Sequence, residues 1–214
     1  MDLGRTPDTR HLAMVAGAGF DASVVHRMAA CRRGHISYLD YFWPLWRTFW
    51  EYRFPPIRVR ADGAEVFAGR GLPFVANIPR YAWGLPICKH ARLDDGLLDV
   101  CVFDCAWQGR LLSHAVVTSM GRHLGRRGVH YRQARVIEID AGAPLPLQID
   151  GDPAGTTPIR FEVRPAKALI LLPPRPTRGG RYEVRRRAPE ADARQRSAEP
   201  RFGRQGVRKH ECHE

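Results

Sequence analysis

The chain has 214 residues, of which 44% are hydrophobic and 26% are charged, and its formal net charge is +12 at pH 7. These values are ordinary for a globular protein, and the length suffices for one domain with a hydrophobic core. No run of about 18 apolar residues occurs, and the first ten residues lack an apolar segment. The composition therefore argues against a transmembrane helix and against a secretory signal.

Positive charge is concentrated toward the C-terminus. Residues 175–214 hold twelve Lys or Arg residues against six Asp or Glu, with few apolar residues, a composition typical of disorder. We therefore predict a folded domain over residues 1–174 and a disordered Arg-rich tail over residues 175–214. A basic balance favours anionic partners such as phosphates, nucleic acid or acidic lipid surfaces. The five cysteines are odd in number and show no CxxC spacing, which indicates free thiols in a reducing cytoplasm.

The first quarter of the chain predicts a strand and two helices. Residues 11–20 are apolar and end in a Gly-rich turn, which predicts a strand followed by a helix with Asp21 at its N-cap. Residues 36–54 place aromatic side chains at helical spacing. Two interpretations stay open for this second helix. Its aromatic face either packs on the core or lies at a membrane interface, with Arg47 and Arg53 on lipid phosphates.

The rest of the chain is rich in strands. The alternating segments on either side of Asp62 and Gly63 predict a β-hairpin, because Asp-Gly favours a type I′ turn. Residues 106–124 predict a third helix with apolar residues on one side. Further strands are predicted over residues 72–78, 97–104, 135–140, 146–150, 159–163 and 168–172. The fold class that follows is mainly β with helical insertions (α+β), arranged as an antiparallel β-sandwich.

Three turns carry candidate functional residues. The turn Asp94–Gly96 offers carboxylates and carbonyl oxygens that suit a hard cation such as Mg²⁺, although any Asp-Gly turn has the same composition. The turn Asp150–Asp152 closes a strand, where a carboxylate can act as a general base or can simply belong to the turn. Gly17 and Gly19 permit close approach of the backbone.

Taken in order, five segments resemble the diacylglycerol kinase family, which includes bacterial lipid kinases, sphingosine kinases and ceramide kinases. The segments are GAGFDA (17–22), NIPRYAWG (77–84), ARLDDGLLDV (91–100), LQIDGDP (147–153) and VRPAKAL (163–169). They match the C-terminal domain of that family from about Asp2 to Pro173. The resemblance implies the C-terminal β-sandwich of a lipid kinase, an enzyme that transfers phosphoryl groups from ATP to a lipid hydroxyl.

The resemblance also implies a metal site and a catalytic residue. A structural Mg²⁺ lies at the D-D-G turn of bacterial members, so its ligands here would be the Asp95 carboxylate and the carbonyl oxygens of Arg92 and Leu97. The general base of the family is the Glu of a D-G-E turn, and Asp152 occupies that position. Asp is one methylene shorter than Glu, so this base reaches less far toward the hydroxyl proton. We expect the sandwich to bring the turns that carry Asp95 and Asp152 to one edge, so that the two carboxylates converge on a common cleft.

Substrate binding is assigned by the same resemblance to residues around a hydrophobic cleft, namely Asp21, Asn77 and Tyr81. The loop after Asn77 departs from the family pattern, because Ala82 and Trp83 stand where a glycine pair is usual. This departure adds bulk where the backbone is expected to pass closely.

No segment resembles the G-G-D-G-T loop with which the family binds ATP. We therefore expect ATP to act only where a nucleotide-binding domain is supplied, and we expect the chain alone to be inactive. Two functions stay open: the substrate half of a lipid kinase, or a non-catalytic lipid-binding or regulatory module derived from one. Expected partners are a lipid substrate, the inner face of a membrane, the nucleotide-binding domain and a second copy of the chain as a homodimer. Nucleic acid is not expected, because the basic tail has too few aromatic residues for base stacking.

Overall fold

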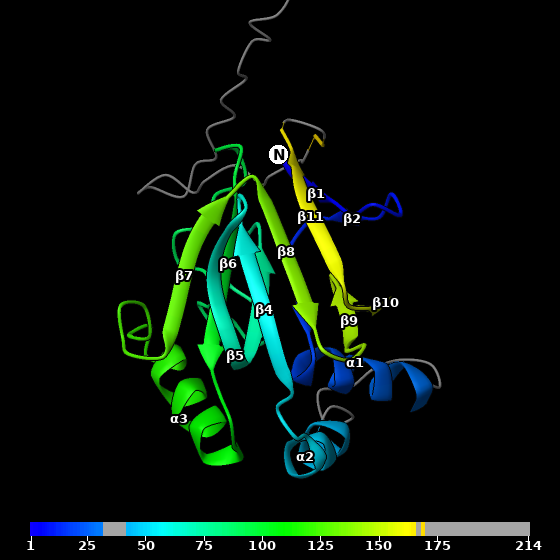
Figure 1. Ribbon diagram of the computed structural model, residues 1–214, viewed down its shortest axis with the longest axis vertical. Coiled ribbons are helices and arrows are strands. Elements are labelled where there is room, and N and C mark those ends of the chain that lie inside the picture. Colours follow the sequence, from blue (N-terminus) through cyan, green and yellow to red (C-terminus); the bar gives the residue numbers. More distant parts are fainter. Residues whose placement is uncertain (32–41, 166–167, 170–214) are drawn as a thin grey trace, which may run out of the picture. The chain divides into compact units, whose positions relative to one another are not determined.

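The computed structural model describes residues 1–31, 42–165 and 168–169 (Figure 1). These residues belong to a compact unit, Met1–Ile170, whereas a second unit, Leu171–Glu214, lies outside the described residues. The predicted tail and most of the predicted strand over 168–172 therefore stay predictions. None of the described helices is both long enough and apolar enough to cross a membrane.

The described residues form helices and strands in the following order. They are β1 Leu3–Arg5, β2 His11–Leu12, β3 Val15–Ala18, α1 Phe20–Cys31, α2 Phe42–Glu51, β4 Pro56–Ala61, β5 Ala64–Ala76, β6 Leu98–Asp104, α3 Gln108–Ser119, β7 Val129–Ala134, β8 Val136–Ala141, β9 Pro146–Ile149, β10 Asp152–Thr156 and β11 Ile159–Arg164. The three predicted helices are thus present, although residues 36–41 of the second lie outside the described residues.

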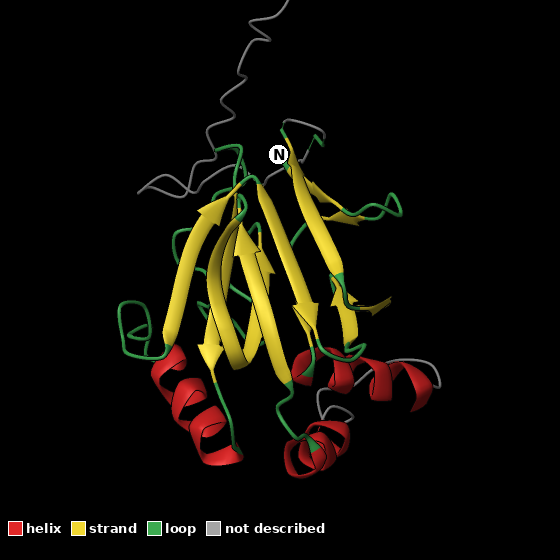
Figure 2. Ribbon diagram, in the orientation of Figure 1, coloured by secondary structure: helices red, strands yellow, loops and turns green. Residues whose placement is uncertain are grey.

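The strands form an antiparallel sheet that curls into a sandwich-like half-barrel (Figure 2). Neighbouring strands follow the order β10-β9-β3-β5-β4-β8-β11-β1-β2, with β6 paired to β5 and β7 paired to β6. Strand β5 serves both halves of this sheet, because it pairs with β4 up to Arg70 and with β6 from Gly71 onward. The predicted class, an antiparallel β-sandwich with helical insertions, is confirmed.

Two apolar clusters stabilise this fold. The first fills the space between the two halves of the sheet and includes Val59, Ile137 and Phe161. The second lies on the other face of β5 and β6 and includes Leu72 and Phe103. Strand β6 is consequently buried along nearly its whole length, which explains why its sequence, LDVCVFD, reads as a continuous apolar run rather than an alternation.

The hairpin predicted at Asp62 and Gly63 is confirmed, because their φ angles of 49° and 80° are both positive, as a type I′ turn requires. The strand that follows is longer than predicted, since β5 continues through the two expected segments without a break. Strands β7 and β10 were not predicted. Their sequences, VHYRQA and DPAGT, lack the alternation of apolar residues that marks a strand.

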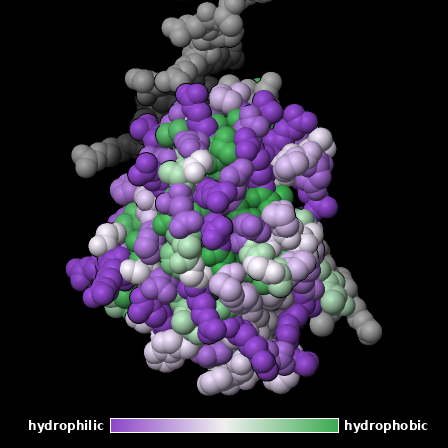
Figure 3. All heavy atoms as spheres, in the orientation of Figure 1, coloured by the Kyte–Doolittle hydropathy of each residue, from purple (hydrophilic) through white to green (hydrophobic). Residues whose placement is uncertain are grey.

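The outer face of the β4–β8–β11 half is polar. Exposed and buried residues alternate along β4, and hydrophilic side chains are spread over this face in Figure 3. Surface ion pairs join Arg58 to Glu65 at 3.2 Å and Arg160 to Glu138 at 2.8 Å. Such exposed pairs contribute little stability, and we take this face to be simply solvated.

Helices α2 and α3 expose a large part of their apolar surface. Leu45 and Phe49 of α2 pack against the second cluster, as the core-facing interpretation expects, whereas Phe42, Trp46 and Trp50 are exposed. The large exposed apolar residues of the two helices and of the turn after α3 are Phe42, Trp43, Trp46, Trp50, Leu112, Val116 and Met120.

The passage of β5 from one half of the sheet to the other requires a glycine at position 71. A Cβ atom there would lie 2.7 Å from a ring carbon of Phe67 and 3.0 Å from the carbonyl oxygen of Phe103. We expect Gly71→Ala to lower the free energy of unfolding by about 1–3 kcal/mol through overpacking. Gly142→Ala is the matched control, because a Cβ at Gly142 meets nothing within 4 Å. Urea unfolding of both variants tests this, and an equal loss in the two would contradict it.

Candidate functional site

A large apolar pocket lies beside β5 and β6. Its volume is about 870 Å³, and its walls come from α1, α2, β5, β6, α3 and the loop of residues 77–87. Phe20, Leu72, Phe74 and Phe103 contribute apolar wall surface, and Asp21 is the one carboxylate among the described residues that line it. Pockets of this size and character bind small apolar molecules and orient them through a few polar groups.

Asp21 is held by two neutral hydrogen-bond donors. Its Oδ2 accepts a hydrogen bond from Gln148 Nε2 at 2.9 Å and one from the Tyr81 hydroxyl at 3.2 Å. Burial raises the pKa of Asp21 to about 6, although both hydrogen bonds oppose this shift. The carboxylate is therefore an acceptor within a mostly apolar cavity, where a further hydroxyl or amine donor would be well placed to bind.

The glycine pair before Asp21 makes this arrangement sterically feasible. A Cβ at Gly17 would lie 2.5 Å from Asp21 Oδ2, and a Cβ at Gly19 would collide with the Tyr52 hydroxyl. Gly19 directly precedes helix α1, and its carbonyl oxygen accepts the Ser23 N–H at 2.8 Å. The prediction that Asp21 caps this helix is wrong. Asp21 lies inside the first turn, where its side chain is free to face the pocket.

Gln148 connects Asp21 to the turn that carries Asp152. Its Nε2 donates to Asp21, while its Oε1 accepts the backbone N–H of Gly151 at 2.9 Å. Residues 150 and 151 have φ angles of 53° and 91° and form a tight turn between β9 and β10. Asp152 follows directly as the exposed first residue of β10. Asp152 is thus joined to Asp21 only through Gln148 and this turn. Neither Asp152 nor Asp95 is among the described residues that line the pocket, so the two carboxylates do not converge on this cleft.

Asp150 and Asn77 fasten the neighbouring loops. The Asp150 carboxylate accepts hydrogen bonds from the backbone N–H groups of Ala13, Met14 and Val15 at 2.8–2.9 Å. Asn77 is fully buried, and its Nδ2 donates to the carbonyl oxygens of Asp2 and Ala13 at 2.8 and 3.3 Å. Asn77 therefore braces the loop in this structure, and its predicted contact with substrate stays a prediction.

The Asp95 turn lies at the same end of the sheet as the Asp152 turn. The carboxylate of Asp2 accepts the N–H of Gly96 at 2.7 Å, and the carbonyl oxygen of Asp2 accepts from Asn77, which is bonded in turn to the loop held by Asp150. This chain of hydrogen bonds joins the two turns through the loops between them. The strand register agrees, since the last residues of β5 and β9 and the first of β3 and β6 share this edge.

The Asp95 turn carries one exposed carboxylate and, near it, a buried one. Asp95 is exposed and its Oδ1 accepts the N–H of Leu97 at 3.1 Å. Burial raises the pKa of Asp99 to about 7, against a hydrogen bond from Gln133 and with a further contribution from the charge of Asp95. Asp99 Oδ1 is buried without a hydrogen-bond partner among the described residues.

No cluster of three or more His, Cys, Asp or Glu side chains suited to a metal occurs in the described part of the chain. A cation at this turn would therefore depend on the Asp95 carboxylate, on carbonyl oxygens such as those of Arg92 and Leu97, and on water.

The conformation of the loop of residues 77–87 shows how Trp83 is accommodated at a position where the family usually has glycine. Tyr81 and Leu85 form an isolated β-bridge, and Trp83 and Gly84 at its tip have φ angles of 52° and 79°. Trp83 thus adopts a backbone conformation for which glycine is usual. Its side chain is 64% exposed, so its bulk lies at the mouth of the pocket and does not fill it.

Sequence reasoning did not single out Gln148, Asp150 or Asp2 as structural partners of the site. The presence of the polar Gln148 in an otherwise apolar strand could have indicated such a role, because a buried amide requires hydrogen-bond partners. Nothing in the sequence indicated that α3 would line the pocket, because this depends on where the helix packs in the fold.

The raised pKa of Asp21 predicts a pH-dependent stability. The folded chain holds the Asp21 proton more tightly than the unfolded chain, so the free energy of unfolding falls as pH rises from about 4 to about 6 and stays lower above that range. We expect Asp21→Asn to gain about 1–3 kcal/mol relative to wild type between pH 4 and pH 8.

Urea unfolding of wild type and Asp21→Asn across this pH range measures the effect. Asp140→Asn is the control, because Asp140 is exposed on β8 and lies outside the pocket lining. A wild-type-to-variant difference that does not change with pH would contradict the expectation.

Residues 14–172 match the family model of the YegS C-terminal NAD kinase beta sandwich-like domain. A diacylglycerol kinase of Mycobacterium tuberculosis is 28% identical over 178 residues, which cover 81% of this chain and 57% of that protein. A Pseudomonas putida protein named "Probable lipid kinase YegS-like" is 26% identical over 175 residues, or 81% of this chain and 56% of that protein.

The fold also resembles a solved structure. The crystal structure of a candidate diacylglycerol kinase from Bacillus anthracis str. Sterne aligns with a TM-score of 0.55 at 18% identity, covering 77% of this chain and 53% of that one. The chain thus spans little more than half the length of the relatives that it matches. The resemblance seen in the sequence is confirmed, and the chain belongs to the family of YegS C-terminal NAD kinase β-sandwich-like domains.

Proposed function

We propose that the chain is the substrate-binding half of a lipid kinase of the diacylglycerol or sphingoid type. The observation that carries this proposal is the 870 Å³ apolar pocket with the Asp21 carboxylate on its wall. The apolar walls suit acyl chains, and Asp21 with Tyr81 offers hydrogen bonds to a polar head group. Membership of a family with lipid kinases among its relatives supports the same conclusion.

In the proposed reaction, Asp152 removes the proton from the lipid hydroxyl group. The oxygen of this hydroxyl group attacks the γ-phosphorus of ATP at the same time. The oxygen–phosphorus bond to the lipid forms, the bond to the β-phosphate oxygen breaks, and ADP leaves. ATP is held by a nucleotide-binding domain, either in a longer chain or in a separate one. Catalysis in such transfers depends mainly on positioning, to which this chain contributes through the pocket and the link from Asp21 by Gln148 to the Asp152 turn.

The second candidate is a non-catalytic lipid-binding or regulatory module. The short side chain of Asp152 and the exposed Trp83 at the pocket mouth favour it. Both candidates require the pocket to bind lipid. They differ in whether phosphate reaches the lipid when ATP and a nucleotide-binding domain are supplied.

Replacement of Asp152 distinguishes these candidates. A general base contributes about 10²–10⁴ in rate, so we expect Asp152→Asn to lower phosphoryl transfer by about 100-fold. Asp152→Glu lengthens the side chain by one methylene, and we expect it to raise the rate several-fold or more.

Transfer of radiolabelled phosphate to a diacylglycerol or sphingoid base measures the rate, with a nucleotide-binding domain supplied. Asp140→Asn controls for loss of an exposed carboxylate elsewhere on the domain. Equal, background-level labelling by wild type and both Asp152 variants, with lipid still bound, would favour the non-catalytic module.

The Asp95 turn gives a second test, through metal binding. We propose that Asp95, with the carbonyl oxygens of Arg92 and Leu97, holds a structural Mg²⁺. A ligand that binds only the folded state raises its stability, so Mg²⁺ is expected to raise the melting temperature of wild type and not that of Asp95→Asn. Thermal unfolding with Mg²⁺ or EDTA measures this. The neighbouring Asp94→Asn serves as the control, and an equal Mg²⁺ effect on all three proteins would contradict the assignment.

A further inference from the structure

All five tryptophans of the chain are exposed around the mouth of one pocket. Tryptophan side chains are on average highly buried in globular proteins. Here four of them line the pocket, and the fifth is on α2, next to a lining residue. Their exposed fractions are 65% for Trp43, 48% for Trp46, 60% for Trp50, 64% for Trp83 and 61% for Trp107.

These tryptophans come from three separate parts of the chain. Three lie on α2, one lies at the tip of the 77–87 loop, and one directly precedes α3. Gln108 Nε2 of α3 donates to the carbonyl oxygen of Tyr52 at 3.2 Å, which ties α3 to the end of α2. Helix α3 and the turn after it add Leu112, Val116 and Met120, which are 58%, 46% and 65% exposed. We call the five tryptophans and these three residues the tryptophan rim.

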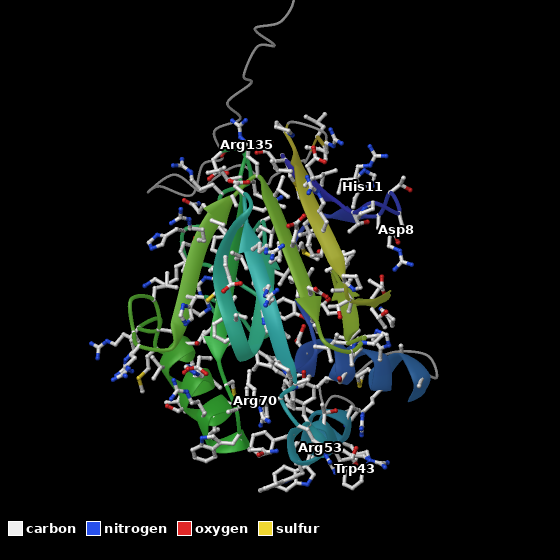
Figure 4. All side chains as sticks on the ribbon, in the orientation of Figure 1. Asp8, His11, Trp43, Arg53, Arg70 and Arg135 are labelled. Atoms are coloured by element: carbon white, nitrogen blue, oxygen red, sulfur yellow. The ribbon has the colours of Figure 1, made fainter. Side chains whose placement is uncertain are left out.

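The charges beside the rim are positive or neutralised. Helix α3 contains no Asp or Glu, and the single acidic residue of α2, Glu51, is paired with Arg27 and Arg47. Arg53 and Arg70 are exposed and take part in no ion pair among the described residues. In Figure 4 their side chains lie at the same end of the domain as Trp43, opposite Arg135.

We propose that the tryptophan rim docks the chain on the interfacial region of a bilayer that contains anionic lipids. Tryptophan favours the level of the lipid head groups, because its ring is apolar while its N–H needs a polar partner. Unpaired arginines beside the rim attract anionic head groups. The proposal rests on the proposed function in one respect: a rim that surrounds the pocket lets a lipid enter it without crossing water.

The tryptophans themselves provide the measurement. Because every tryptophan of the chain belongs to the rim, tryptophan emission, excited selectively over tyrosine, reports on this surface, and the Arg-rich segment 175–214 contains no tryptophan. We expect vesicles of phosphatidylcholine mixed with phosphatidylglycerol to shift the emission to shorter wavelength, and brominated lipid in them to quench it. Neither step needs ATP or a nucleotide-binding domain, so a failure of phosphoryl transfer leaves this result unaffected.

Trp43 and Met120 are suited to substitution because they belong to the rim but do not line the pocket. Docking is expected to bury about half of each of these two side chains in the bilayer interface. The double variant Trp43→Ala, Met120→Ala should therefore partition into these vesicles at least about tenfold more weakly than wild type. Met14→Ala is the control. Met14 is an exposed apolar residue, 46% accessible, but it lies outside the rim, in the segment whose backbone N–H groups bond to Asp150. It is expected to bind as wild type does.

Two results would overturn the proposal. In the first, sedimentation with vesicles is unaffected by the double substitution and the emission does not shift, which would assign binding to the basic segment. In the second, the chain is dimeric without vesicles, the double substitution makes it monomeric, and vesicles leave the wild-type emission wavelength unchanged. That result would make a second copy of the chain the occupant of the rim.

Discussion

The geometry of the pocket depends on the side-chain amide of Gln148. This group is completely buried and bonds in two directions, to the Asp21 carboxylate and to the backbone of the turn before Asp152. Because the donor and acceptor atoms of an amide point apart, one side chain fixes the distance between two elements from opposite ends of the sequence. Removing it would leave a buried carboxylate with fewer donors, which is among the more costly defects in a protein interior.

The walls around this amide come from the way the sheet is divided. Strand β5 leaves the β4 half at Arg70 and enters the β6 half at Gly71, and the second apolar cluster forms on the surface that it then shares with β6. Helices α2 and α3 and the 77–87 loop pack at the margins of this surface without closing over it. The pocket is therefore a gap between elements that are each fixed by the sheet, which favours a site that is present before any ligand binds.

The exposed tryptophans and the pocket form one continuous apolar surface. Contiguous apolar surface on a soluble domain carries a cost in solubility, and it commonly marks an interaction site. In this domain the apolar surface inside the pocket continues to the outside through Trp46, Trp50 and Trp83. A substrate that is itself a membrane component would meet apolar contacts along its whole path. The catalytic and the non-catalytic candidates share this property, and they differ in whether the bound lipid is phosphorylated.

The sequence by itself determined the class of the fold and the order of its parts. Alternation and an Asp-Gly pair identified the β4–β5 hairpin, and the ordered motifs identified the family, because these signals are local in the chain. Helix α2 was predicted, but the direction of its aromatic face was not, since helical spacing is the same for a face in the core and a face in solvent. The N-cap assignment of Asp21 failed for a similar reason: an Asp near a helix start suits a cap unless a partner elsewhere binds it. Only the tertiary structure supplied those partners, Tyr81 and Gln148, because they lie 60 and 127 residues away in the chain and meet Asp21 only when the sheet has formed.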